Sequence, residues 1–295
     1  MEQGIIVKAL AGYYYVENKK SKHIIQCRSR GLFRKNKITP LVGDHVNYTV
    51  EKDNDGYVME VHERKNELVR PPIANVDLAL VVFSATEPAF SVKLLDRFLA
   101  VIEDKRIEPV IIITKMDLLS DPQLKELEPV WAYYENIGYR IFKTSSKNSE
   151  GMKELDNFIQ DQTIVVCGQS GVGKSSLLNG LDDLLDIEVN EISKALGRGK
   201  HTTRHVQLHK LGEARVADTP GFSSLDLDGL DVEDLSFAFL EFDKISENCR
   251  FRGCLHEQEP GCAVKAAVEE KTVLGSRYEN YLVFLNEIKE RKPKY

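Results

Sequence analysis

The stretch Thr163-Ile-Val-Val-Cys-Gly168-Gln-Ser-Gly-Val-Gly-Lys174-Ser175 decides the fold of this 295-residue chain. Its first five residues form an apolar, β-branched run that is typical of a buried strand, and residues 175–185 favour a helix. Between them lies the pattern G-x-x-x-x-G-K-[ST], whose glycines let backbone N–H groups curl around phosphate oxygens. The helix that follows presents its positive end to the same anion. The stretch therefore predicts a site for nucleotide phosphates at the end of a strand.

Each residue type in this loop has an expected role. Lys174 is expected to reach the β- and γ-phosphates, and Ser175 to ligate Mg²⁺. A glycine-rich strand–helix turn without a ligand is the alternative, and the flanking elements disfavour it. The residues predicted to bind the phosphates are Gly168, Gln169, Ser170, Gly171, Val172, Gly173, Lys174, Ser175 and Ser176.

Strands and helices alternate on both sides of the loop. The strand-like runs are apolar and β-branched, whereas the helical runs carry apolar residues on one side. Such alternation indicates a parallel sheet with helices on both faces. The expected strands are 76–84, 110–113, 139–143, 163–167 and 214–217, and the expected helices are 92–105, 123–136, 152–160 and 278–288.

The segment Thr114-Lys115-Met116-Asp117 indicates whether the bound nucleotide carries adenine or guanine. It follows a predicted strand, and ligands bind at the carboxyl ends of strands in open α/β sheets. A carboxylate there can accept hydrogen bonds from N1–H and the 2-amino group of guanine, and adenine has no matching donor pair. A loop of solvated charges would also fit this short pattern, but Thr144-Ser145-Ser146 adds a second contact to the base. The predicted base-binding residues are Thr114, Lys115, Asp117, Ser145 and Ser146.

Two further segments fit a switch that senses the γ-phosphate. Asp218-Thr-Pro-Gly221 follows a predicted strand; its aspartate can hold the Mg²⁺ shell through water, and its glycine N–H can contact the γ-phosphate. The basic, glycine-rich segment Gly197–Thr203 precedes it. Thr202 or Thr203 can close over Mg²⁺, as in order–disorder switch loops, and the sequence leaves open which of them does so.

These segments resemble the GTPase motifs, but they occur in the order G4-G5-G1-G2-G3. The residues are 114–117 for G4, 144–146 for G5, 168–175 for G1, those near 202–203 for G2 and 218–221 for G3. Motif-bearing strands can still meet in one sheet if the usual termini are joined and new ends are cut elsewhere. The joint would be the helix 152–160, which leads into the strand 163–167. The segment 222–235 then leads from G3 directly into a C-terminal part, which a switch movement could shift. Taken together, the motifs favour a GTPase over a generic P-loop ATPase.

Residues 1–70 contain short strand-like runs that are separated by turn-prone residues and show no helical period. This spacing indicates a small barrel, with an OB-fold as the leading candidate and a small β-sandwich as the alternative. The runs are 4–9, 13–16, 23–28, 45–51 and 57–63.

The composition fits a globular protein, with 42% hydrophobic and 29% charged residues. Neither a membrane span nor a secretory signal is found, so we expect a cytoplasmic protein without disulfides or membrane contacts. Cys27 and Cys167 are then expected in the core. Although the net charge is −6, the block 19–37 holds eight Lys or Arg and no acid, and local fields of this kind steer polyanions.

A cluster of potential metal ligands lies near the C-terminus. Cys249, Cys254, His256 and Cys262 offer three thiols and one imidazole within 14 residues, and structural zinc prefers such sets. In a reducing compartment, clustered cysteines favour a metal over disulfides. All four positions of a tetrahedral zinc ion would be filled, so the ion would stabilise the fold. Buried thiols that are close by coincidence are the alternative.

The permuted order, the preceding barrel and the following Cys/His cluster together resemble the ribosome small subunit-dependent GTPase A family. The likeness covers nearly the whole chain. Supporting strings are Val42-Gly-Asp-His-Val46, Arg70-Pro-Pro-Ile-Ala-Asn-Val-Asp77 and Gly199-Lys-His-Thr-Thr203.

This resemblance implies an OB-fold in residues 1–70, a circularly permuted GTPase domain in 71–228 and a zinc-binding domain with a C-terminal helix in 229–295. It also implies that the small (30S) ribosomal subunit stimulates GTP hydrolysis during its own late maturation. The implied ligands and partners are GTP and GDP, Mg²⁺, one structural zinc ion, and the subunit with its rRNA. Nothing in the sequence suggests an obligate dimer, so a monomer is expected.

Hydrolysis needs a group that orients the attacking water. Many GTPases place Gln after the G3 glycine, whereas this chain has Phe222, which cannot orient water by hydrogen bonding. Intrinsic hydrolysis should therefore be slow. The resemblance points to His201 as the catalytic residue; a simple RNA contact is its alternative role, and Arg198 and Arg204 are alternative charge stabilisers.

The basic block 19–37 suits a barrel face that follows an RNA backbone, with Phe33 and tyrosines 13–15 as stacking residues. The alternative is a solvated charged loop with the aromatic residues in the core. A second RNA contact is expected from the C-terminal part. The residues expected there are Arg250, Arg252, Lys265 and Arg277, whereas His23, His45, His62, His205, His209 and Trp131 are expected at ordinary surface or core positions.

Three rival functions remain open at this stage. A P-loop GTPase could act on another RNA or on a membrane target. A non-catalytic RNA-binding switch could use GTP only to control affinity, which Phe222 would permit. A zinc-containing DNA binder fits least well, because of the acidic net charge and the nucleotide motifs.

Overall fold

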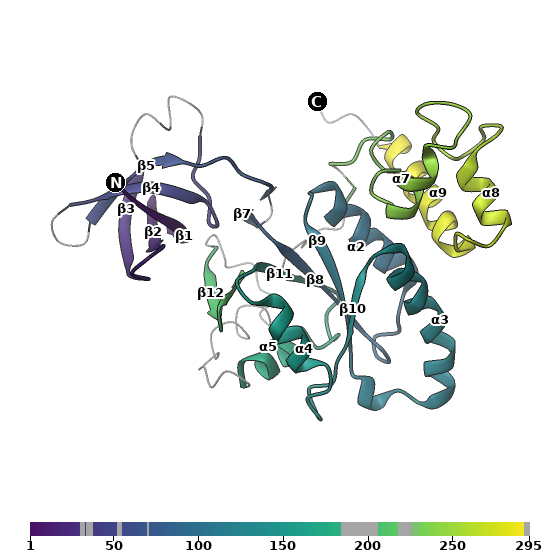
Figure 1. Cartoon of the computed structure of the whole chain (residues 1–295), viewed down its shortest axis with the longest axis horizontal. Helices are drawn as coiled ribbons and strands as arrows, with labels where there is room; N and C mark the ends of the chain where they lie inside the picture. The colour runs from purple at the N-terminus through teal and green to yellow at the C-terminus, as the bar shows by residue number, and fades with distance from the viewer. Residues whose placement is uncertain are drawn as a thin grey trace.

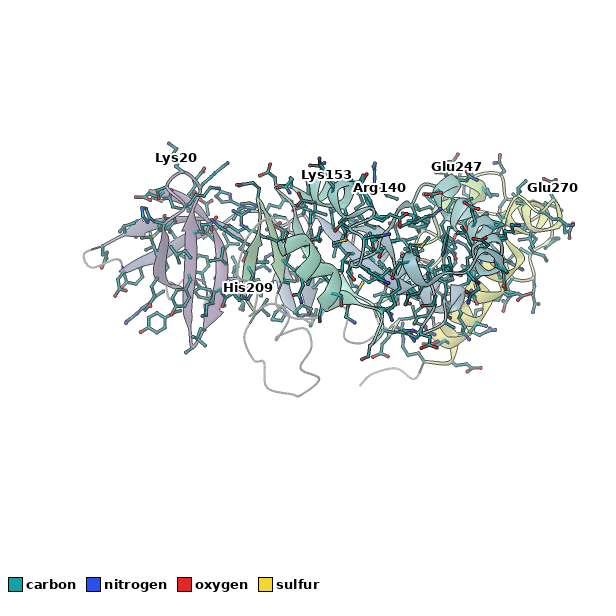
Figure 2. The ribbon with its side chains drawn as sticks, turned by 90° about the horizontal axis from the view of Figure 1, so that it is seen from below. Lys20, Arg140, Lys153, His209, Glu247 and Glu270 are labelled. Atoms are coloured by element: carbon teal, nitrogen blue, oxygen red, sulfur yellow. The ribbon has the colours of Figure 1, made fainter. Side chains whose placement is uncertain are left out.

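The computed structural model describes residues 1–29, 33, 38–51, 55–69, 71–183, 206–217, 226–227 and 229–291. Figure 1 shows a small barrel at one end, a sheet with helices in the middle and a group of helices at the other end. The view from below in Figure 2 shows the same three parts in a row. No helix among these residues is long and apolar enough to span a bilayer.

The N-terminal part is a closed barrel with the strand order β1-β2-β3-β5-β4. β1 pairs with β2 and also with β4, and Gly4 lies at this double pairing. A Cβ at residue 4 would lie 2.5 Å from the carbonyl oxygen of Glu17, so only glycine fits there. The OB-like barrel is confirmed and the sandwich alternative is wrong. The strands are β1 (Glu2–Leu10), β2 (Tyr13–Asn18), β3 (Ile24–Ser29), β4 (His45–Val50) and β5 (Asp55–Val61).

The central part is a six-stranded sheet with the order β10-β9-β8-β11-β13-β12. β8, β9, β10, β11 and β13 run parallel, and β12 forms an antiparallel hairpin with β13 at one edge. The expected strands are all present, whereas the edge strand β12 was not predicted. The strands are β8 (Leu78–Ser84), β9 (Glu108–Thr114), β10 (Arg140–Lys143), β11 (Thr163–Cys167), β12 (Leu208–Leu211) and β13 (Ala214–Ala217).

Helices cover both faces of this sheet because successive strand residues point to opposite sides. Val81 and Phe83 pack with α2 (Val92–Asp104) and with Trp131 of α3 (Asp121–Ile137). On the other face, the alternate strand residues Leu80, Val82, Val110, Ile112, Ile164 and Val166 pack with α4 (Met152–Ile159) and α5 (Lys174–Asp183). Trp131, Cys27 and Cys167 are buried, as the sequence predicts.

The barrel and the sheet are joined by a short hairpin of β6 (Glu67–Val69) and β7 (Pro72–Ala74). Gly43 has a φ of +90°, and a Cβ there would lie 2.0 Å from the carbonyl oxygen of Ala74. The Asn75 side chain donates to the Gly43 carbonyl at 3.0 Å, and Arg64 pairs with buried Asp44 at 2.7 Å. The residues 42–46 and 71–77 therefore form the joint between two parts.

The C-terminal helices are α7 (Leu240–Ser246), α8 (Ala263–Glu269) and α9 (Gly275–Glu290). α9 packs on α2, and α7 packs on α8. Arg277 of α9, whose side chain is fully buried, contacts both α2 and α7. Its Nη1 contacts Asp96 of α2 at 2.6 Å, and its Nη2 contacts Glu241 of α7 at 3.0 Å. Asn280 of α9 also donates to Asp96, at 2.7 Å, so two side chains of the same helix bind this carboxylate.

The expectation that Arg277 contacts RNA is wrong. Its guanidinium lies 4.5 Å from the ring centre of Phe239 and is paired with two carboxylates, so no part of it reaches solvent. The basic residue pattern alone could not show this, because the two carboxylates that bury it lie 36 and 181 residues away.

Replacing Arg277 by Met should destabilise the docking of the C-terminal helices by about 3–5 kcal/mol, because it leaves Asp96 and Glu241 buried without a cation. Urea unfolding followed by tryptophan fluorescence measures the change. Lys289→Met is the matched control: it breaks only the exposed pair with Glu257 and should cost about 0–1 kcal/mol. Equal effects of the two variants would contradict the central role of Arg277.

Candidate functional site

The predicted nucleotide-binding segments meet at one edge of the sheet, at the carboxyl ends of parallel strands. Thr114 ends β9, Thr144 follows β10 and Gly168 follows β11. β8 lies between β9 and β11, and its last residue, Ser84, pairs in register with Thr114. Segments that are distant in sequence thus form one continuous rim.

The loop between β11 and α5 depends on three glycines with positive φ. The values are +137° at Gly168, +82° at Gly171 and +97° at Gly173, a region that other residues enter only with strain. At Gly168 there is also no space, since a Cβ would lie 2.2 Å from the carbonyl oxygen of Val82 in β8. α5 begins directly after this loop, at Lys174, so its N-terminal N–H groups face the same region.

The hydroxyl of Thr114 connects the segment 114–117, predicted to bind guanine, with the loop 168–173, predicted to bind phosphate. Its Oγ1 donates to the Val172 carbonyl at 2.5 Å and also lies 3.2 Å from the Phe83 carbonyl. Thr114 is buried, so this bond is shielded from water. The ends of β8 and β9 and the loop after β11 are therefore held in one arrangement.

Lys115 and Asp117 are positioned by different contacts. Lys115 has a left-handed backbone with a φ of 61°, and its Nζ donates to the Gly171 carbonyl at 2.9 Å. It also donates to the Glu87 carbonyl. Asp117 is exposed and accepts a hydrogen bond from the Ser145 hydroxyl at 2.6 Å, which orients its carboxylate. Ser145 is buried, whereas Ser146 is exposed at the rim.

Lys174 folds over the loop. Its Nζ donates to the Gly168 carbonyl at 2.8 Å and to the Gln169 carbonyl at 2.6 Å. Burial lowers the pKa of Lys174, because the ammonium group loses solvation among the loop carbonyls. A phosphate oxygen beside it would supply the negative charge that these carbonyls only partly provide.

The second candidate site is the cluster of Cys249, Cys254, His256 and Cys262, whose ligand atoms all lie within 4.8 Å of one another. His256 Nδ1 lies 3.3 Å from Cys262 Sγ and 3.7 Å from Cys249 Sγ. A tetrahedral zinc ion with Zn–S of about 2.3 Å and Zn–N of about 2.0 Å separates its ligands by roughly 3.5 Å. The donor set therefore fits such an ion in both chemistry and size.

The surroundings of this cluster orient its donors. His256 Nε2 lies 3.0 Å from the Ser236 hydroxyl, so Nδ1 is the nitrogen that faces the thiols. The Ala263 N–H donates to Cys249 Sγ at 3.3 Å, as does the Lys265 N–H to Cys262 Sγ at 3.5 Å. Ser236 was not predicted from the sequence, because serine is common and lies 20 residues before the histidine.

Family models match most of the chain. The model described as the RsgA N-terminal domain matches residues 3–58, and the model described as RsgA GTPase matches residues 61–228. The second match covers more than half of the chain and includes every predicted nucleotide segment.

The chain belongs to the RsgA GTPase family.

Full-length RsgA relatives support this assignment. The chain is 56% identical to a protein of Bacillus cytotoxicus over 295 residues and 53% identical to one of Bacillus subtilis over 298 residues, each covering 100% of both chains. Both relatives are named small ribosomal subunit biogenesis GTPase RsgA.

Two solved structures are similar over almost their whole length. YloQ, described as a circularly permuted GTPase, has a TM-score of 0.86 at 47% identity and covers 100% of this chain and 97% of its own. YjeQ from Thermotoga maritima has a TM-score of 0.87 at 35% identity and covers 99% of each chain.

These findings confirm the predicted family, the permuted fold and the enzyme class: the chain is a GTPase. The base-type segments after β9 and β10 precede the phosphate-type loop after β11 in this RsgA chain. In the sheet, only β8 separates β9 from β11, so these segments lie at the same edge. Five predicted site residues lie outside the described residues, namely His201, Thr202, Thr203, Asp218 and Gly221.

The predicted stacking role of Phe33 is wrong. Its side chain is 8% exposed and belongs to the core, which agrees with the alternative of a charged loop with core aromatics. The segment 84–88 after β8 was missed, although it contributes the Glu87 carbonyl that holds Lys115. The apolar run that ends at Ser84 could have indicated it, because β8 leads to the same edge as the motif-bearing strands.

The two glycines Gly168 and Gly171 should respond differently to alanine. Gly171→Ala should cost about 1–3 kcal/mol through its positive φ alone, since the nearest atom to a new Cβ is 3.8 Å away. Gly168→Ala should cost more and also abolish nucleotide binding, because the loop must move away from Val82. Thermal unfolding and GTP titration measure both effects. A Gly168→Ala protein that binds GTP normally would contradict the tight packing of the loop on β8.

Proposed function

We propose that this GTPase assists the late maturation of the small (30S) ribosomal subunit, binds that subunit and its rRNA, and hydrolyses GTP when the subunit stimulates it. The observation that carries the proposal is the meeting of three nucleotide motifs at one sheet edge in permuted order, in a chain whose full-length relatives are named as small-subunit biogenesis GTPases. The division into residues 1–70, 71–228 and 229–295 stays a prediction, and these three parts are the units to which we assign RNA contact, catalysis and zinc binding.

In this proposal the loop 168–176 binds the nucleotide phosphates through its backbone N–H groups and Lys174. The guanine base lies against Lys115 and is recognised by Asp117, whose carboxylate the Ser145 hydroxyl orients. Ser146 lies at the exposed rim beside it. The tie from Thr114 to Val172 supports the proposal, because it holds the base-binding and phosphate-binding segments at a fixed separation.

We assign the Mg²⁺ contacts to Ser175, to Thr202 or Thr203, and indirectly to Asp218. The ion, when bound, neutralises charge that develops on the phosphate oxygens. Gly221 is assigned to the γ-phosphate and His201 to the attacking water. Phe222 supports the last assignment, since it leaves the usual water-positioning place without a hydrogen-bonding side chain.

RNA contacts are assigned to the outer barrel and to the C-terminal part. Arg28 lies 5.0 Å from the ring centre of Tyr13 and donates to its hydroxyl at 2.9 Å, so the pair presents a cation and an aromatic ring at the surface. Arg250 and Phe251 form a similar exposed pair in the C-terminal part, 5.4 Å apart. Such pairs suit a phosphate backbone with unstacked bases. We expect the protein to act as a monomer.

Small ribosomal subunits should raise GTP turnover by about 10³–10⁵-fold over an intrinsic rate on the order of 10⁻⁴ s⁻¹, because they complete the site in trans. Turnover is measured with the protein alone, with purified small subunits and with large subunits. His201→Ala should keep GTP affinity and lose the stimulation. If only large subunits stimulate turnover, or if neither subunit does, the small subunit is not the partner. The second result would favour a non-catalytic switch. A stimulated His201→Ala protein would remove only the role of His201.

The proposed zinc site makes a separate prediction. The purified protein should contain one zinc ion, and Cys262→Ser should lower its zinc content to near zero and destabilise the C-terminal part, because the ion would hold together the segment that carries the four ligands. Cys27→Ala is the matched control, because Cys27 is a buried cysteine of the barrel and should leave the metal in place. Elemental mass spectrometry gives the metal content. Full zinc occupancy in Cys262→Ser would contradict the assigned ligand set.

A further inference from the structure

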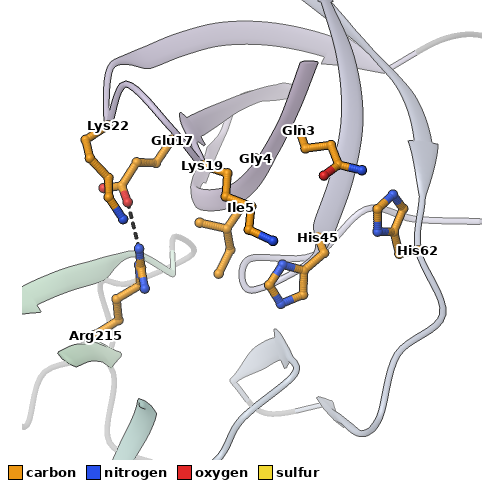
Figure 3. A pocket seen from close by; sticks show the side chains of 9 residues that line it. All are labelled: Gln3, Gly4, Ile5, Glu17, Lys19, Lys22, His45, His62 and Arg215. Carbon is orange, nitrogen blue, oxygen red and sulfur yellow. Dashed lines mark hydrogen bonds and ion pairs between the residues drawn. The ribbon is translucent and has the colours of Figure 1, made fainter. Parts of the chain in front are cut away.

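A cavity of about 510 Å³ opens where the barrel meets the hairpin of β12 and β13. Its size is in the usual range for pockets that hold small molecules. Figure 3 shows Lys19, His45 and His62 of the barrel on one side of it and Arg215 of β13 across from them. Walls from two parts of the molecule therefore enclose one space, and its lining includes none of the residues of the loop 168–176 or of the segment 114–117.

The single carboxylate of the cavity wall is already neutralised. Glu17 is buried and contacts Arg215 at 2.7 Å and Lys210 at 3.3 Å. Lys19 and Lys22 also line the cavity, and no described carboxylate lies within ion-pair distance of either ammonium group. The cavity thus carries two lysine charges that the described part of the chain does not balance.

The remaining polar groups of the wall are mainly donors or can become donors. His45 and His62 gain a second N–H when protonated, and the Gln3 amide offers two more N–H groups. Nε of Arg215 is buried and has no hydrogen-bond partner among the described residues. Buried donors without partners are rare in native proteins, so a missing acceptor is the natural explanation.

The electrostatic environment of His45 agrees with an excess of positive charge. Partial burial lowers the pKa of His45, and the neighbouring His62, Lys19 and Arg215 lower it further, while Asp77 acts in the opposite direction. A bound anion would reverse this effect, because an opposite charge nearby favours the protonated imidazole.

We propose that this cavity binds a phosphate group, with Lys19 and Lys22 as its main charge partners and the two histidines as further donors. A dianionic phosphate balances both lysine charges, whereas a carboxylate balances only one. Ammonium and guanidinium groups bond phosphate oxygens more strongly than neutral donors do. The phosphate comes from a small phosphorylated molecule or from an RNA backbone, and both present the same oxygens to these side chains.

Occupation of this site would connect the barrel to the GTPase sheet. Arg215 reaches from β13 to Glu17 of the barrel, and β13 ends one residue before Asp218. β1 also contacts β12, and Lys8 of β1 bridges to Gln207, which directly precedes β12. A ligand held against both walls would reinforce these contacts, which gives the site a structural consequence beyond the proposed function.

The test titrates inorganic phosphate into the full chain at low salt, followed by ³¹P NMR. The nucleotide site is first filled with a non-hydrolysable GTP analogue and Mg²⁺, so that binding there does not contribute. Lys19→Gln/Lys22→Gln should bind phosphate at least about tenfold more weakly than the wild type, because it removes both charged donors. Lys20→Gln is the matched control, since Lys20 is exposed in the same turn and does not line the cavity.

Imidazole NMR signals locate the phosphate independently. Phosphate should shift the signals of His45 and His62 and leave that of His256, which is buried in the C-terminal part, unchanged. An octamer of uridylate tests the source. If the octamer binds, needs Lys19 and Lys22 for binding and is displaced by inorganic phosphate, the site is assigned to RNA. If inorganic phosphate binds but the octamer does not, the site is assigned to a small phosphorylated molecule. No phosphate binding, no shift at His45, or equal affinity of all variants would overturn the proposal.

Discussion

The parallel pairing of β8 with β9 and with β11 is the constraint on which the rest of this molecule depends. Parallel strands end on the same edge, so each turn that follows them faces the same ligand space. Because both faces of these strands are covered by helices, a slip of one residue would exchange the side chains that pack on the two faces and disturb both cores. The register is therefore strongly determined, and with it the position of Thr114 opposite Ser84 and beside Val172.

This constraint also explains how permutation leaves the site intact. The chain enters the sheet at β8 and visits β9 and β10 before returning to β11, so the motifs for the base precede those for the phosphates. Pairing depends on strand register rather than on chain order, and α4 supplies the connection to β11. The permutation instead changes which part of the chain follows the predicted G3 segment. β13 now leads toward the C-terminal helices, and the hairpin of β12 and β13 lies against the barrel.

The outer parts are joined to the GTPase sheet in different ways. The C-terminal helices are held by a fully buried cation, Arg277, with carboxylates from α2 and α7 around it. The barrel is held by the tight contact of Gly43 with Ala74 and by the partly exposed pair of Arg215 and Glu17. Buried ion pairs are costly to break, whereas partly exposed pairs are worth less. Loss of one ion-pair partner should therefore destabilise the C-terminal connection more than the barrel connection.

Local sequence patterns were sufficient for much of the fold. Strands such as Thr163–Cys167 and helices such as Val92–Asp104 show their period directly, and the glycine pattern at 168–173 permits only a few backbone conformations. The cysteine–histidine spacing placed four donors within 4.8 Å, as expected for ligands on one short segment. The edge strand β12, by contrast, is four residues long and gains its strand character only by pairing with β13.

The sequence by itself determined the alternation of elements, the five-motif order and the identity of the groups that can bind phosphate, base and metal, because each of these resides in a few neighbouring residues. Only the tertiary structure decided which charged groups are buried and which face a shared space. Arg277 looks like a surface cation until Asp96 and Glu241 surround it, and His45 and His62 look ordinary until β13 brings Arg215 to face them. Burial and electrostatic environment are set by residues that are distant in sequence, so no local pattern carries them.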